Sequence, residues 1–185
     1  MSYEDNDIKI FSSKKSDASD NDILSMVENL NEQRQNGNTQ KAESLGYALA
    51  TVAFSDETKA EIADPRFFAP ETYAQLGVLF LFSAEAALNY FLPSAQLSTI
   101  AITALHKQLG EMESEFYKNV MESSAYSFYY LCVRKGGEDV ATDIGKTFAM
   151  LCKQEGNEDY INQGRSLYNM VLHEVEKEVT SLAFK

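Results

Sequence analysis

The sequence predicts an all-α protein, and three observations lead to that prediction. Between residues 19 and 184 no stretch alternates convincingly between apolar and polar side chains, as a half-buried strand would. Residues 71–92, ETYAQLGVLFLFSAEAALNYFL, form a long apolar run between two prolines. Residues 158–182 carry apolar side chains at helical spacing. We therefore predict a single-domain bundle of about seven or eight helices, with the last three forming an antiparallel up-down set.

The run at residues 71–92 is the helix around which we expect the others to pack. Proline favours the first turn of a helix and cannot continue one, so Pro70 and Pro93 delimit a helix of about 33 Å. A helix that is apolar almost all round belongs inside a protein. The alternative is a membrane span, but residues 76–92 fall short of about 20 and contain Glu85 near their centre. We therefore expect no membrane partner.

Four polar side chains of this helix, Glu71, Gln75, Glu85 and Asn89, fall on one narrow arc. One interpretation is that the arc marks the exposed edge of the helix. The other is that Glu85 and Asn89, one turn apart, form the polar floor of an apolar pocket. An unpaired buried carboxylate there would be costly, and burial would raise its pKa. Glu85 and Asn89 are therefore the candidate ligand-binding residues.

The charge of the chain restricts its partners. Sixteen basic against 28 acidic residues leave a formal charge of -12, which repels phosphate backbones and anionic lipid headgroups. Nucleic acid is therefore not expected as a ligand. The acidity serves either solubility alone or a basic protein partner.

The two cysteines indicate a reducing compartment. Cys132 and Cys152 both lie in apolar stretches, and their spacing of 20 residues matches neither a zinc pair nor a redox Cys-x-x-Cys motif. We expect them to pack as small buried apolar groups. The N-terminus shows no basic segment followed by an apolar one, as a secretory signal would have, so we expect a cytoplasmic protein.

The first third of the chain reads as a tail and three helices. Residues 1–19 are polar and serine-rich and predict a flexible acidic tail in front of an all-helical domain at 20–185. The first helix should begin at Asp20 or Asn21 and end at Gly37. Thr39 can cap the second helix, whose small residues allow another helix to approach closely. A short helix should follow and end before Asp64.

After Pro93 we expect Ser94 to cap a helix that breaks at Gly110, followed by a helix over residues 113–135. The latter contains an aromatic cluster, Tyr126, Phe128, Tyr129 and Tyr130. These tyrosines cannot all share one side with the phenylalanine, so at least one must reach a surface or groove. Tyr126, Tyr129 and Tyr130 are therefore the candidate partner-binding residues. The alternative is core packing with the hydroxyls at its boundary.

An internal echo predicts how the last helices connect. Six residues of the segment 128–139 recur 20 positions later: Phe128, Leu131, Cys132, Gly136, Glu138 and Asp139 match Phe148, Leu151, Cys152, Gly156, Glu158 and Asp159. In each copy we expect Phe, Leu and Cys on the buried face of a helix, Gly at the end of that helix, and Glu-Asp in the first turn of the following helix. This predicts helices at about 113–135, 138–154 and 158–182. The echo fits an ancient duplication or two independent helical hairpins.

Several chemistries lack their motifs. Gly145-Lys146-Thr147 resembles the end of a phosphate-binding loop, but Val140 stands where that loop needs glycine, so Lys146 should be an ordinary surface lysine. No Glu-x-x-His occurs, and both histidines, His106 and His173, should face solvent. We therefore expect no metal and no other cofactor.

No motif of this chain identifies a known family. We expect a cytoplasmic, non-enzymatic helical interaction or adaptor module that binds another protein through a tyrosine-containing groove or self-associates. The alternative is a small-molecule-binding or enzymatic bundle that uses Glu85, Asn89 and a nearby tyrosine. A deep apolar pocket above Glu85 would favour the alternative, and an exposed aromatic patch would favour the first.

Overall fold

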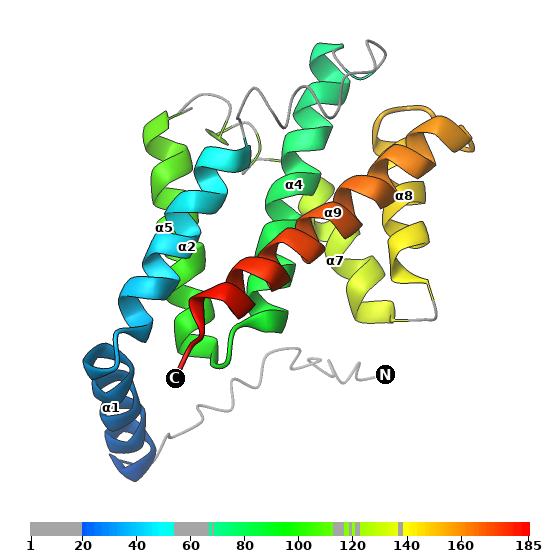
Figure 1. Cartoon of the computed structure of the whole chain (residues 1–185). Coiled ribbons are helices and arrows are strands. Elements are labelled where there is room, and N and C mark those ends of the chain that lie inside the picture. The colour runs from blue at the N-terminus through cyan, green and yellow to red at the C-terminus, as the bar shows by residue number, and fades with distance from the viewer. Residues whose placement is uncertain are drawn as a thin grey trace, which may run out of the picture.

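The computed structural model describes residues 20–53, 67, 69–112, 117–118, 120, 123–136 and 139–185. This part of the chain contains seven α-helices and no strand, which confirms the all-α prediction (Figure 1). The tail at 1–19 and the short helix expected before Asp64 lie outside the described residues. The helices are α1 Asp20–Gln35, α2 Asn38–Ala53, α4 Pro70–Phe91, α5 Ala95–Met112, α7 Ala125–Lys135, α8 Val140–Leu151 and α9 Glu158–Leu182.

Helix α4 is the centre of the bundle, as its apolar sequence predicts. It packs against α2, α5, α7, α8 and α9. In Figure 1, α9 crosses α4 diagonally, the α2–α5 pair lies on one side of it and the α7–α8 pair on the other. The helix begins at Pro70 and ends one residue before Leu92, which is extended and leads into Pro93. The two prolines therefore delimit the helix as expected.

Among the helices of the described residues, α4 alone is long and apolar enough to cross a membrane. That test uses length and composition only. Of its most apolar 18-residue window, 56% is buried inside the protein. Because the core helix of a folded domain passes the same test, the match is weak evidence for a membrane span.

The segment after Pro93 differs from the prediction in two places. Ser94 caps α5, since its hydroxyl accepts a hydrogen bond from the Leu97 amide at 3.3 Å. The segment does break, but α5 continues past Gly110 to Met112, so the predicted position of the break was wrong. The single helix expected over residues 113–135 was also wrong, because Ser123 lies outside any helix and α7 begins at Ala125. The Ser123 hydroxyl accepts from the Ala125 amide at 3.2 Å, a local bond that competes with helix continuation.

Helices α7, α8 and α9 alternate in direction, as the echo predicts (Figure 1). Gly136, with φ of 62°, ends α7. At the end of α8, by contrast, Lys153 takes the left-handed conformation, with φ of 57°, and its amide donates to the Met150 carbonyl. The Gln154 amide donates to the Ala149 carbonyl, which completes a Schellman motif. Gly156 therefore shapes the turn into α9 and does not terminate α8.

Helices α2 and α5 pack closely against each other, and Gly46 permits this approach. A Cβ atom at Gly46 would collide with the Ala101 carbonyl oxygen and lie 2.9 Å from the Ala104 side chain. Backbone atoms cannot move aside as the end of a flexible side chain can. The expectation that small residues of α2 admit a neighbouring helix is therefore confirmed.

We predict that Gly46→Ala destabilises the protein by about 2 kcal/mol or more, because the α2 and α5 backbones must separate. Urea unfolding followed by circular dichroism measures this change. Gly110→Ala is the matched control within α5, since its new Cβ would meet only the Tyr117 ring at 3.7 Å. The control should stabilise the protein by up to about 1 kcal/mol through helix propensity. Equal effects of the two substitutions would contradict the close-approach argument.

Candidate functional site

Glu85 is part of a chain of polar side chains that joins three segments. Its Oε1 lies 2.6 Å from Nε2 of His106 on α5, and Nδ1 of His106 lies 2.9 Å from the Tyr117 hydroxyl. The Glu85 and His106 side chains are 20% and 21% exposed. Glu85 is thus half-buried and paired, which offsets the cost of removing a carboxylate from water. We call Glu85, His106 and Tyr117 the polar chain.

The solvent-facing position predicted for His106 was wrong, whereas His173 is exposed as expected. His106 does lie opposite the Leu97, Ala101 and Leu105 stripe of α5. That stripe packs toward the core, but Glu85 of α4 and Tyr117 cover the other flank. A single apolar stripe in the sequence predicts that one face of the helix is buried. A helix that packs against several neighbours has more than one buried face.

Tyr126 of α7 is a further tyrosine beside the polar chain. Its ring packs edge-on against Phe82 of α4, with centroids 5.4 Å apart. The hydroxyl is buried and has no hydrogen-bond partner among the described residues. Burial, and then the negative charge of Glu85, raise the pKa of Tyr126 and also that of Tyr117. Both phenols therefore keep their protons at neutral pH.

The polar chain presents hydroxyl, imidazole and carboxylate in the order that a general-base catalyst uses. The raised pKa of Tyr117 makes its phenol a weaker acid, so transfer of its proton to His106 is less favourable. The arrangement is suited to holding α4, α5 and the Tyr117 segment together. No residue pattern in the sequence connects Glu85 with His106 and Tyr117, because they lie 21 and 32 positions apart.

The remaining polar residues of the α4 arc occupy different environments. Glu71 and Asn89 are exposed, so Asn89 does not join the polar chain. Gln75 is half-buried, and its side-chain oxygen has no hydrogen-bond partner among the described residues. The structure therefore separates the two candidate ligand-binding residues, Glu85 and Asn89, into a half-buried and an exposed position.

The three candidate tyrosines of α7 also occupy different environments. Tyr129 is fully buried and packs against Phe82, with ring centroids 5.4 Å apart. Tyr126 is half-buried, as described above. Tyr130 is 58% exposed. The expectation that at least one tyrosine reaches the surface is met by Tyr130.

Besides Tyr130, helix α7 exposes two further large apolar side chains. Phe128 is 44% exposed and Leu131 is 55% exposed. Together with Tyr130, Arg134 and Lys135, these residues define what we call the outer face of α7. The echo placed Phe128 and Leu131 on a buried face, and that prediction was wrong. Phe148, the counterpart of Phe128, is buried because α9 covers α8, whereas no helix among the described residues covers α7 in the same way.

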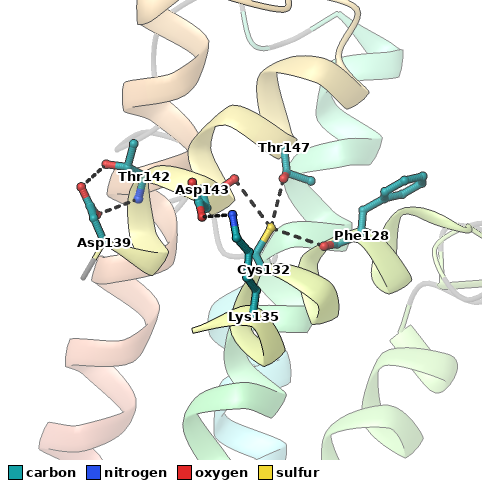
Figure 2. Close-up of polar contacts among 7 residues, drawn as sticks. All are labelled: Phe128, Cys132, Lys135, Asp139, Thr142, Asp143 and Thr147. Carbon is teal, nitrogen blue, oxygen red and sulfur yellow. Dashed lines mark hydrogen bonds and ion pairs between the residues drawn. The ribbon is translucent and has the colours of Figure 1, made fainter. Parts of the chain in front are cut away.

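Cys132 marks the side of α7 that faces α8 (Figure 2). Its sulfur lies 3.2 Å from the Thr147 hydroxyl and 3.4 Å from the Phe128 carbonyl oxygen. In Figure 2 the Phe128 ring points away from this cluster. Both cysteines are half-buried free thiols, and burial raises the pKa of Cys152 to about 12. Such a thiol is a poor nucleophile, in keeping with the packing role predicted for it.

Two open hollows lie elsewhere on the described surface. One, of about 430 Å³, is lined by residues of α8 and α9 that include Lys146 and Glu158. The other, of about 490 Å³, lies among α1, α2 and α5. Neither is lined by Glu85, Asn89 or the α7 tyrosines. Among the described residues, no group of three or more His, Cys, Asp and Glu side chains could hold a metal ion.

Lys146 is exposed, as predicted, and the glycine before it has a packing role. A Cβ atom at Gly145 would collide with the Ile161 carbonyl oxygen of α9. The resemblance of Gly145-Lys146-Thr147 to a phosphate-binding loop therefore arises from a helix contact.

Comparison with known proteins finds no protein family, no curated protein and no solved structure that matches this chain.

We predict that Glu85 and His106 stabilise the fold through each other. A double-mutant cycle with Glu85→Ala and His106→Ala should give a coupling energy of about 1–2 kcal/mol at pH 7, because the pair is half-buried. The exposed Glu174–Lys177 pair on α9, at 3.2 Å, is the matched control and should couple by less than about 0.5 kcal/mol. Urea unfolding of the single and double variants measures both. Equal coupling in the two pairs would contradict this role of the polar chain.

We also predict that Tyr129 makes the fold sensitive to alkali. Burial, and then the nearby Cys152 and Cys132, raise the pKa of Tyr129 above its ordinary value of 10.0. As the pH rises, Tyr129 therefore loses its proton in the unfolded chain before it does so in the folded protein. The contribution of Tyr129 to the free energy of unfolding is complete below pH 10 and falls at higher pH. The loss should reach about 1.4 kcal/mol per pH unit.

The variant Tyr129→Phe should remove the share of the alkaline loss that Tyr129 causes, whereas Tyr117, Tyr126 and Cys152, whose pKa values burial also raises, keep theirs. It should be at least as stable as the wild type at pH 7, because the hydroxyl has no partner among the described residues. Urea unfolding between pH 8 and pH 11 measures the profile. Tyr130→Phe, at an exposed position, is the control and should leave the profile unchanged. An unchanged profile in Tyr129→Phe would contradict the prediction.

Proposed function

We propose that this protein is a non-enzymatic helical interaction module that binds an acidic, amphipathic protein segment through the outer face of α7. The observation that carries the proposal is the exposure of three large apolar side chains of α7, Phe128, Leu131 and Tyr130. Aromatic and arginine side chains are the residue types that most often dominate binding energy at protein interfaces. The outer face combines both.

The charge of α7 supports an acidic partner. The helix contains Arg134 and Lys135 and no acidic residue, in a chain whose formal charge is -12. It is the only described helix with more basic than acidic side chains. Both basic residues are exposed at the C-terminal end of the helix, next to the apolar surface. This separation suits a partner that presents apolar side chains beside carboxylates.

The polar chain supports a structural role over an enzymatic one. Glu85 and His106 are mostly covered by the protein and are paired with each other at 2.6 Å, so they join α4 to α5. A catalytic site needs an accessible cavity in which a substrate meets the reacting groups. The outer face of α7 is already accessible.

Site-specific crosslinking in the native cells tests the proposal. A photoreactive phenylalanine analogue replaces Leu131, and the crosslinked peptide is sequenced by mass spectrometry. We expect a discrete adduct whose peptide is acidic and has apolar residues at helical spacing. The side chain is exposed, so the replacement should leave the fold intact, which circular dichroism checks.

The same analogue at Tyr90 is the control, because Tyr90 is an exposed aromatic residue of α4, outside the outer face of α7. It should give no adduct of the same mass. The proposal is wrong if Leu131 yields no adduct beyond that of the Tyr90 control, or if the crosslinked peptide is basic or lacks apolar residues.

A further inference from the structure

Helix α1 exposes a second apolar surface. Leu24 and Val27, three residues apart on the helix, are 59% and 51% exposed. The helix projects from one end of the bundle in Figure 1 and packs mainly against α2. It contains four acidic residues and one basic residue, and Glu28 and Glu32 are both exposed. We call Leu24, Val27, Glu28 and Glu32 the acidic face of α1.

The acidic face of α1 cannot cover the outer face of α7 within one molecule. The turn between α1 and α2 is held by Asn38, whose side-chain nitrogen donates to Gln33 at 2.6 Å and to the Lys185 carbonyl at 2.7 Å. The Asn38 oxygen accepts from the Lys185 amide at 3.2 Å. In Figure 1, α1 then points away from the bundle, and α7 lies on the far side of α4 and α9. A contact between the two faces therefore requires two molecules.

The two faces match in polarity, charge and spacing. On α1 the apolar pair Leu24 and Val27 precedes the acidic pair Glu28 and Glu32. On α7 the apolar pair Phe128 and Leu131 precedes the basic pair Arg134 and Lys135. At about 1.5 Å per residue, the centres of the apolar and charged pairs are separated by about 7 Å on both helices. A parallel alignment therefore places apolar on apolar and acidic on basic groups at the same time.

We propose that the outer face of α7 binds α1 of a second copy of this chain. In the resulting dimer, α1 of each copy lies on α7 of the other, an arrangement that we call the exchange. This inference rests on the proposed function, since it uses the same α7 surface. A reciprocal exchange is closed by a two-fold axis, so it ends at the dimer and leaves neither face open. The contact is made twice, which doubles the area that the two copies bury against each other.

Charge reversal tests the exchange in the full-length protein. One variant carries Glu28→Lys and Glu32→Lys, and the other carries Arg134→Glu and Lys135→Glu. All four side chains are exposed, and the Lys135 ion pair with Asp143, at 3.8 Å, is an exposed contact that contributes little to folding. Circular dichroism checks that both variants fold. Analytical ultracentrifugation then gives the dissociation constant of each variant and of their equimolar mixture.

We expect the wild-type chain to dimerise and each variant alone to dimerise at least about tenfold more weakly, since each brings like charges together. In the mixture both contacts pair opposite charges again, so the heterodimer should recover most of the wild-type affinity. Higher salt should weaken the wild-type dimer. A monomeric wild-type chain would overturn the inference. So would a dimer that survives in either variant alone, because it would join α1 to α1, α7 to α7 or other surfaces.

The crosslinking experiment separates this inference from the proposed function. A peptide from residues 20–35 of the chain itself, crosslinked to Leu131 of another copy, supports both. An acidic amphipathic peptide from a different protein supports the proposed function and overturns the exchange.

Discussion

Burial of α4 is the constraint on which the rest of the structure depends. Its side chains are apolar in nearly every direction, so the helix is stable in water only when neighbours surround it. Helices α2, α5, α7, α8 and α9 supply that cover. Close packing on so many sides leaves little freedom in the placement of each neighbour, which is why Gly46 and Gly145 stand where backbones must nearly touch.

The burial of α4 by its neighbours also explains why the two copies of the echo have different environments. Phe128 and Phe148 occupy equivalent places in the sequence, but α8 lies between α7 and α9 and is covered by both. Helix α7 uses Tyr126 and Tyr129 to pack against α4, which turns Phe128 and Leu131 outward. An apolar surface left in that position is a common mark of an interaction site. The local sequence repeats, whereas the surroundings do not.

The polar chain shows how a carboxylate is accommodated on the core helix. Glu85 faces α5, where His106 pairs with it and Tyr117 in turn contacts the other ring nitrogen of His106, and the neighbouring phenol Tyr126 stays protonated. A half-buried pair of this kind offsets the cost of removing the Glu85 side chain from water and fixes the orientation of α4 relative to α5. The cluster therefore helps to explain how a core helix with few polar residues specifies its rotation about its own axis.

Local physics in the sequence determined the helices themselves. Proline cannot continue a helix and apolar periodicity requires a buried face, so α1, α4 and α9 appear close to their predicted limits, as do Ser94 and Gly136 at helix ends. Only the tertiary structure decided which face of each helix is covered. His106 and Leu131 were misplaced because burial depends on partners tens of residues away, and no pattern within one helix records them. The candidate sites follow the same division: the residue types are visible in the sequence, and their grouping is a property of the packed bundle.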